Sequence, residues 1–113
     1  MKYLKQYEDL IEDTPTLLFK DFLNIKYWRY RNKKIDSIFK IDNIDSSRDW
    51  NTDFFIIVLN LDKNEIQTFK FDSGFIQAII HLDDPYKILR PATKDEIKEF
   101  KFFIFMKANK YNI

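Results

Sequence analysis

The 113-residue sequence contains no cysteine, one glycine, three prolines and one histidine. The absence of cysteine excludes disulfides, thiolate nucleophiles and cysteine-ligated zinc sites, and it suits a reducing cytosol. A single glycine excludes the glycine-rich phosphate-binding loops, because those loops need several glycines for the backbone to approach the phosphates. Nucleotide hydrolysis by these routes is therefore not available to this chain.

Long apolar runs and a strong net charge are also missing. The longest apolar runs, Phe54–Leu59 and Phe102–Met106, are far shorter than the roughly 20 residues that cross a bilayer. Residues 1–13 carry charges throughout, so we expect no signal peptide, a cytoplasmic location and no membrane partner. Because the formal net charge is only +1, any electrostatic recognition must be local.

The residues that are present suffice for one hydrophobic core. Hydrophobic residues make up 45% of the chain, charged residues 33% and aromatic residues 18%, and 12 Phe supply most of the bulky apolar volume. This composition is typical of a folded chain, and the length falls within the range of a single domain. We therefore expect residues 1–113 to form one domain.

The N-terminal part of the chain predicts a helix that ends near Asp13, because its apolar residues recur at spacings of one, three and four. The sequence Thr14-Pro15 then indicates a break before a new element. Residues 17–23 fit either a short helix or an extended segment. The apolar residues of the predicted first helix are Tyr3, Leu4, Tyr7, Leu10 and Ile11.

The segment KYWRYRNKK, Lys26–Lys34, carries five cations and three aromatic rings. Its alternation predicts a strand in which Trp28 and Tyr30 point toward the core. Residues 31–34 are polar enough to turn, and residues 35–41 continue as an alternating partner strand. The side chains on the opposite, outer face of the first strand are Tyr27, Arg29 and Arg31.

The same basic segment carries the alternative hypothesis of nucleic-acid binding, in which aromatic rings stack on bases and cations bind phosphates. The alternation disfavours it, because Trp28 and Tyr30 fall on the face opposite to the arginines. A strand whose arginines are solvated or paired with nearby aspartates explains the pattern better. The candidate nucleic-acid-binding residues are Tyr27, Arg29, Arg31, Lys33 and Lys34.

The longest polar stretch, Asn43–Asp53, predicts an exposed, acidic loop that contains Trp50. Exposed tryptophan is enriched at binding hot spots, and the surrounding aspartates would present an acidic surface to a basic partner. The alternative is that Trp50 folds back to close one end of the sheet. The candidate partner-binding residues are Trp50, Asp45, Asp49, Asp53 and Arg48.

Two further stretches predict a second hairpin. The run Phe54–Leu61, which is apolar except for Asn60, is typical of a central strand that is covered on both faces. Asp62–Asn64 predicts a compact turn, in which Asn64 adopts a left-handed conformation. Glu65–Phe71 then supplies the returning strand.

The following residues predict a short element on each side of a turn. Phe75–Leu82 favours a helix capped by Ser73, with residues 75, 76, 79 and 80 inward, although a buried strand also fits. Residues 83–85 predict a turn, and Tyr86–Leu89 predicts a last short strand.

The sequence TKDE, Thr93–Glu96, is a capping box. The Thr93 side chain can accept from the backbone N–H of Glu96, and the Glu96 side chain can accept from the backbone N–H of Thr93. A helix therefore begins here, with Asp95 favourable near its positive end. One face of this helix carries Ile97, Phe100 and Ile104. The remaining apolar residues of the helix are Phe102, Phe103, Phe105 and Met106. We expect them to be buried in the core, to form a homodimer interface or to form a partner site.

The segment YKILRPATKDEIKEF, Tyr86–Phe100, resembles the C-terminal part of small proteins from phages and mobile elements of the Bacteroidetes group. In those proteins a strand that ends in Arg-x-Ala-Thr runs into a helix that starts with an acidic pair. The matching positions are Arg90, Ala92, Thr93 and Glu96. The resemblance implies a small β-rich domain with a terminal helix and an accessory role, and proteins of this kind include anti-CRISPR inhibitors of host defence.

Enzymatic chemistry has little support in the sequence. The only cluster that holds a histidine is His81 with Asp83 and Asp84, and it is better explained as an exposed turn. No spacing selects a carboxylate pair, and the serines have only that one imidazole as a base. We therefore expect no catalytic residue, no metal and no cofactor.

These observations predict an α+β domain with a small, curved antiparallel sheet of about five strands, SH3-like or a partly open barrel, with N-terminal and C-terminal helices. The expected function is a non-enzymatic binding protein of a phage or mobile element. It would act by protein–protein contact with a host protein, such as a defence nuclease or its nucleic-acid complex.

Overall fold

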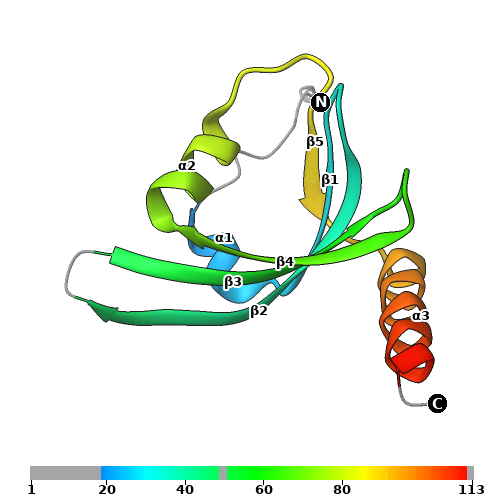
Figure 1. Cartoon of the computed structure of the whole chain (residues 1–113). Helices are drawn as coiled ribbons and strands as arrows, with labels where there is room; N and C mark the ends of the chain where they lie inside the picture. Colours follow the sequence, from blue (N-terminus) through cyan, green and yellow to red (C-terminus); the bar gives the residue numbers. More distant parts are fainter. Residues whose placement is uncertain (1–18, 49–50, 112–113) are drawn as a thin grey trace.

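Five antiparallel strands form one open, strongly curved sheet in the order β4-β3-β2-β1-β5 (Figure 1). The computed structural model describes residues 19–48 and 51–111, so the helix predicted before Asp13 lies outside the described residues. The α+β class expected from the sequence is confirmed. The strands are β1 Tyr27–Arg31, β2 Asp36–Arg48, β3 Asn51–Asn60, β4 Glu65–Asp72 and β5 Ile88–Pro91, and the helices are α1 Phe19–Asn24, α2 Ser73–His81 and α3 Lys94–Tyr111.

The two faces of the sheet are covered by different helices. Helices α1 and α2 lie inside the curve of the sheet, and α3 lies on its outer side (Figure 1). We call these the concave and the convex face. Because successive side chains of a strand point to opposite faces, the same strands supply two separate cores.

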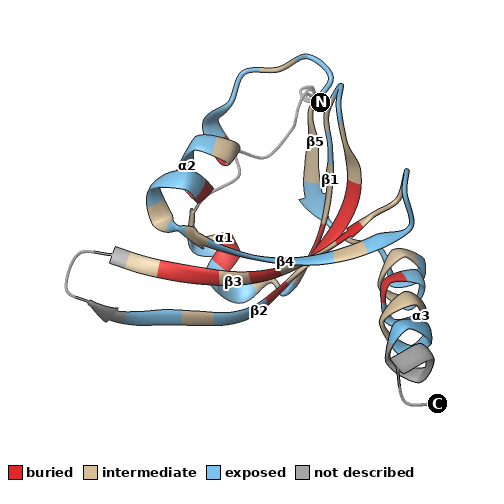
Figure 2. Ribbon diagram, viewed as in Figure 1, coloured by how far each residue is buried: buried red, intermediate tan, exposed pale blue. Residues whose placement is uncertain are grey.

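The concave core is built around a stack of aromatic rings. The rings of Phe22 and Trp28 are 4.2 Å apart between centroids and nearly parallel. The indole Nε1 of Trp28 donates to the carbonyl of Ile25 at 2.9 Å, which satisfies the one polar group of this buried side chain. The buried residues of this core are Phe22, Trp28, Phe39, Ile41, Phe54, Ile56, Ile76 and Ile80 (Figure 2).

The convex core is smaller and lies under α3. Its buried residues are Ile38, Leu59 and Phe100. The ring of Phe100 meets the ring of Tyr27 edge to face, with centroids 5.7 Å apart. Ile104 packs against this core and Ile97 is partly buried, so the apolar helix face predicted from Ile97, Phe100 and Ile104 is confirmed.

The basic segment and the second hairpin follow the sequence pattern. Trp28 and Tyr30 contact the concave core, as predicted, and Tyr27 contacts the convex core. Strand β3 lies between β2 and β4 and contributes to both cores. Asn64 has a positive φ of 54°, the left-handed conformation expected in the turn before β4.

The prediction of an exposed loop over Asn43–Asp53 is wrong. Strand β2 runs to Arg48 and β3 begins at Asn51, so most of these residues form the far end of a long hairpin (Figure 1). A register shift between Ile41 and Asn43 inserts one extra residue into β2. This bulge breaks the alternation of the sequence, which is why the stretch does not resemble a strand.

Two boundaries also differ from the prediction. The last strand covers Ile88–Pro91 rather than Tyr86–Leu89, because Asp84 accepts from the N–H of Tyr86 at 2.9 Å and holds this part in a turn. The segment predicted over Phe75–Leu82 is helical, as favoured, but the helix ends at His81 and its cap is Asp72, not Ser73. The carboxylate of Asp72 accepts from the N–H of Phe75 at 2.8 Å.

The aromatic stack makes Phe22 the side chain of α1 on which the concave core depends. Phe22 is 1% exposed and its neighbour Leu23 is 47% exposed. We expect Phe22→Ala to lower the free energy of unfolding by about 3–5 kcal/mol, because it leaves a cavity beside Trp28. The matched Leu23→Ala should cost less than about 1 kcal/mol.

Urea denaturation followed by tryptophan fluorescence measures both changes. Phe22→Leu provides a milder variant if Phe22→Ala does not fold. Equal losses for the buried and the exposed position would contradict the assignment of Phe22 to the core.

Candidate functional site

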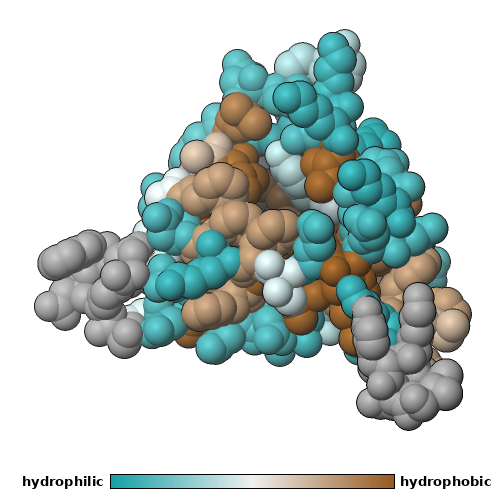
Figure 3. Space-filling model, viewed as in Figure 1, coloured by the Kyte–Doolittle hydropathy of each residue, from teal (hydrophilic) through white to brown (hydrophobic). Residues whose placement is uncertain are grey.

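The concave face contains an apolar cavity of about 240 Å³, which we call the aromatic hollow. It lies between α2 and strands β1 to β4, and Figure 3 shows apolar side chains gathered in the middle of this side of the molecule. Of the described residues that line it, only Tyr30 and Ser37 carry a polar side-chain group. The hydroxyl of Ser37 donates to the Tyr30 carbonyl at 3.0 Å. The lining residues are Phe22, Tyr30, Ile35, Ser37, Phe39, Ile56, Val58, Phe69, Phe71, Phe75, Ile76 and Ile79.

Three rings form a ladder along one wall of the aromatic hollow. The centroids of Phe69 and Phe71 are 5.4 Å apart, and those of Phe71 and Phe75 are 4.3 Å apart, with both pairs stacked. Phe69 is 38% exposed and Phe75 is 46% exposed. Large aromatic side chains left open to solvent beside an apolar cavity are typical of a recognition surface.

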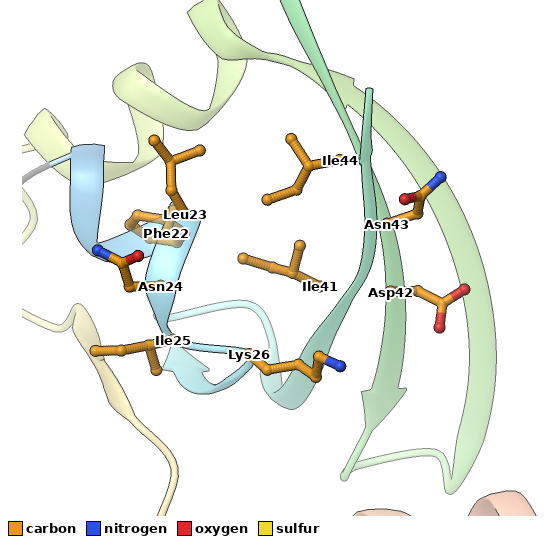
Figure 4. Close-up of a pocket in the computed structure, with 9 residues that line it drawn as sticks. All are labelled: Phe22, Leu23, Asn24, Ile25, Lys26, Ile41, Asp42, Asn43 and Ile44. Atoms are coloured by element: carbon orange, nitrogen blue, oxygen red, sulfur yellow. The ribbon is translucent and has the colours of Figure 1, made fainter. Parts of the chain in front are cut away.

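A second, more open groove of about 310 Å³ lies between α1 and β2. In Figure 4, Phe22 and Leu23 face Ile41 and Ile44 across this groove, whereas Asp42 and Asn43 point away from it on the other side of β2. The bulge in β2 explains this arrangement, because the extra residue brings Ile44 onto the same face as Ile41. Phe22 lines both the groove and the aromatic hollow.

The convex face carries a cluster of two arginines and two carboxylates. Arg29 on β1 pairs with Asp36 on β2, and its other terminal nitrogen lies 2.9 Å from a carboxylate oxygen of Glu96 on α3. Arg90 on β5 makes two hydrogen bonds of 2.9 Å to the same carboxylate. Glu96 therefore links β1, β5 and α3.

Glu96 is also the second half of the capping box predicted from the sequence. Its carboxylate accepts from the N–H of Thr93 at 2.8 Å, and the Thr93 hydroxyl accepts from the N–H of Glu96 at 3.2 Å. Hydrogen bonds from Arg90, followed by those from Thr93 and Arg29, outweigh burial and lower the pKa of Glu96 to about 2. Burial disfavours the charged form of Arg29, but the bonds to Asp36 and Glu96 outweigh it and raise the pKa of Arg29.

The structure places the candidate nucleic-acid-binding residues in different environments. Arg29 is neutralised within the charge cluster, whereas Arg31, Lys33 and Lys34 are exposed at the end of the hairpin. Tyr27 is partly buried against Phe100. The amines of Lys40 and Lys101 lie 5.9 Å and 5.8 Å from the centroid of its ring, a pair that the sequence pattern alone did not reveal.

The predicted acidic partner site is described only in part. Trp50 and Asp49 lie outside the described residues, and of Arg48 the structure describes the backbone at the end of β2. Asp45 is exposed and lies opposite the buried Asp53 on the neighbouring strand. The Lys70 amine lies 4.0 Å from a carboxylate oxygen of Asp53.

Helix α3 has a second apolar surface on the side that faces away from the sheet. Phe102 is 57% exposed, Phe105 is 60% exposed, and Met106 is 49% exposed. These three residues share one helix face, because they are three and four positions apart. The homodimer interface or partner site that the sequence predicts for these residues stays a prediction.

Sequence reasoning missed the aromatic hollow. Phe69 and Phe71 alternate along β4, so the sequence placed them on one face of a strand. Their stacking with Phe75 depends on the direction in which α2 leaves β4, and no local pattern specifies that direction.

Comparisons with known proteins give no assignment: no family model, no curated protein and no solved structure matches the chain. Among the described residues, no group of three His, Asp or Glu side chains is placed to hold a metal ion. None of the helices within the described ranges has the length and apolar character needed to span a bilayer.

The lowered pKa of Glu96 predicts a pH-dependent contribution to stability. At about 1.4 kcal/mol per pKa unit, a shift from 4.5 to about 2 corresponds to about 3 kcal/mol. Because the pKa is lowered in the folded state, this stabilisation is present above pH 4.5 and is lost as the pH falls toward 2. Glu96→Gln should therefore be clearly less stable than the parent chain at neutral pH.

Urea denaturation between neutral pH and pH 2 measures this effect. The difference between the parent chain and Glu96→Gln should narrow as the pH falls. Glu99→Gln is the matched control, since Glu99 is exposed one turn further along the surface of α3. A difference that stays constant with pH would contradict the role of the Glu96 carboxylate.

Proposed function

We propose that this chain is a small, non-enzymatic binding protein that acts by contact with another protein. The aromatic hollow is the observation that carries the proposal, because it combines an apolar cavity with exposed rings at its rim. Its volume of about 240 Å³ is below the roughly 300–1,000 Å³ typical of small-molecule pockets. A large side chain of a partner protein is therefore a better match than a free ligand.

The resemblance of Tyr86–Phe100 to proteins of phages and mobile elements supports a more specific form of the proposal. In this form the chain is an accessory protein in the cytoplasm of a bacterial host, and its partner is a host protein. Inhibition of a defence nuclease, in the manner of anti-CRISPR proteins, is its most concrete version. Among the described residues, the strong polar cluster is the one around Glu96, whose carboxylate already accepts hydrogen bonds from Arg90, Thr93 and Arg29. Because these contacts hold the fold together, the cluster supports a binding role better than a catalytic one.

Capture of host proteins by the tagged chain tests the proposal. We expect Phe75→Asp to reduce the recovery of a specific partner by about tenfold or more, because it places a charge at the rim of the aromatic hollow. Phe105→Asp is the matched control: it makes the same change at an exposed ring on α3. Recovery is measured by quantitative mass spectrometry and confirmed with the purified partner.

The variants separate the candidate surfaces. Loss of the partner with Phe105→Asp alone would move the site to α3. Loss with Trp50→Ala alone, without unfolding, would move it to the acidic partner site that the sequence predicts around Trp50. Failure to capture any protein above the level of an untagged control would contradict the proposed function.

Nucleic-acid binding on the convex face is the second candidate, and the lysines beside Tyr27 favour it. Lys101 and Arg31 are cations of the convex side that could contact phosphates. Arg29 is already paired with carboxylates, and the Lys40 amine lies 3.5 Å from a carboxylate oxygen of Asp42. If this candidate is correct, a gel-shift titration with single-stranded DNA or RNA should show a complex that weakens steeply with salt. It should also weaken with Arg31→Ala and Lys101→Ala.

The matched control for this titration is Lys63→Ala, which removes an exposed cation in the turn between β3 and β4. An absence of any complex at low salt would exclude this second candidate.

A further inference from the structure

The two edges of the sheet differ in how well they are protected. Strand β5 has only four residues and is followed closely by α3. Strand β4, at the other edge, has eight residues, contains no proline or glycine, and pairs with β3 without a register shift. Natural proteins usually shorten, bend or charge such an edge, because it offers unpaired backbone groups to another strand.

The alternating direction of the backbone hydrogen bonds along β3 decides which residues of β4 carry unpaired backbone groups. The N–H of Leu61 donates to the Asp36 carbonyl at 2.8 Å. In an antiparallel ladder the bonding direction alternates from residue to residue. The odd-numbered residues of β3 therefore bond to β2, and the even-numbered residues bond to β4.

Through the pairing of Val58 with Gln67 and of Ile56 with Phe69, the odd-numbered residues of β4 then bond back to β3. The N–H and C=O groups of Thr68 and Lys70 consequently point out of the sheet. An independent contact supports this assignment of outward-pointing residues. The amine of Lys107 donates to the carbonyl of the even-numbered Ile66 at 3.1 Å, so that carbonyl points out of the sheet.

Lys107 satisfies only that one carbonyl at the start of the edge. Among the described residues, the backbone groups of Thr68 and Lys70 on the outer side of β4 have no hydrogen-bond partner. The exposed β4 edge is thus a short ladder of complementary donors and acceptors, which only an extended backbone can pair with fully.

The aromatic hollow lies next to this edge. Phe69 and Phe71 are on the concave face of β4, and Phe75 stacks on Phe71 from α2. A strand that pairs with β4 would place every second side chain on this same face. The edge and the aromatic hollow can therefore be occupied together by one extended segment.

We propose that an extended segment of the partner protein adds to the sheet as a strand beside β4 and inserts a large apolar side chain into the aromatic hollow. This inference rests on the proposed function and specifies its partner as a β-strand with apolar residues at alternate positions. The backbone supplies affinity and the aromatic hollow supplies the side-chain preference.

A displayed library of random peptides about twelve residues long, enough to span a strand, tests the inference with the full chain as the target. We expect the selected peptides to carry large apolar residues at alternate positions. Thr68→Pro should weaken their binding by about tenfold or more, because it removes an outward N–H without breaking a bond to β3. The control Thr68→Val keeps that N–H and should bind within about twofold of the parent chain.

Amide hydrogen exchange gives a second readout on the same complex. The amides of Thr68 and Lys70 should exchange more slowly when the peptide is bound, whereas those of Gln67 and Phe69 already bond to β3 and should change less. Slower exchange at the outward amides is a change that binding at a distant surface would not produce.

The outcomes separate this inference from the proposed function. Peptides that bind Thr68→Pro as well as the parent chain, or no selected peptide at all, would overturn strand addition. Loss of a captured host protein with Phe75→Asp but not with Thr68→Pro would support the proposed function and exclude strand addition as its mode of binding. A parent chain that is dimeric and becomes monomeric with Thr68→Pro would assign the added strand to a second copy and overturn a foreign partner.

Discussion

The carboxylate of Glu96 is the contact on which the arrangement of the C-terminal half depends. It accepts hydrogen bonds from Thr93, Arg90 and Arg29, and so it fixes the first turn of α3 to both β5 and β1. Strand β5 is short, and β1 is its one neighbour among the described strands. Without this carboxylate, the two arginines would remain beside each other, and Arg29 would keep one partner, Asp36.

This contact determines what each face of the sheet can do. With α3 held on the convex face, Phe100 fills the small convex core, and Arg29 is drawn into ion pairs. The concave face is then covered by α1 and α2, whose apolar side chains do not fill the whole curve of the sheet. The aromatic hollow is the space that remains, and it lies beside the long β4 edge.

Local patterns in the sequence predicted much of the fold. The alternation of Trp28 and Tyr30 with the arginines, the left-handed Asn64 and the capping box at Thr93 each depend on a few neighbouring residues. The hairpin end around Asp45 was missed because a bulge interrupts its alternation. The start of β5 was misplaced, since the Asp84 turn extends into residues whose composition suits a strand.

The candidate site was less predictable than the fold, because its parts come from distant segments. The sequence by itself determined the sidedness of each strand and the start of α3, since periodicity and capping act within one element. Only the tertiary structure decided that β4 is an edge, that Phe75 stacks beside it, and that Arg29 meets Glu96 from 67 residues away. Strand order and helix placement depend on burying apolar surface from segments far apart in the chain, and no short window of sequence contains that information.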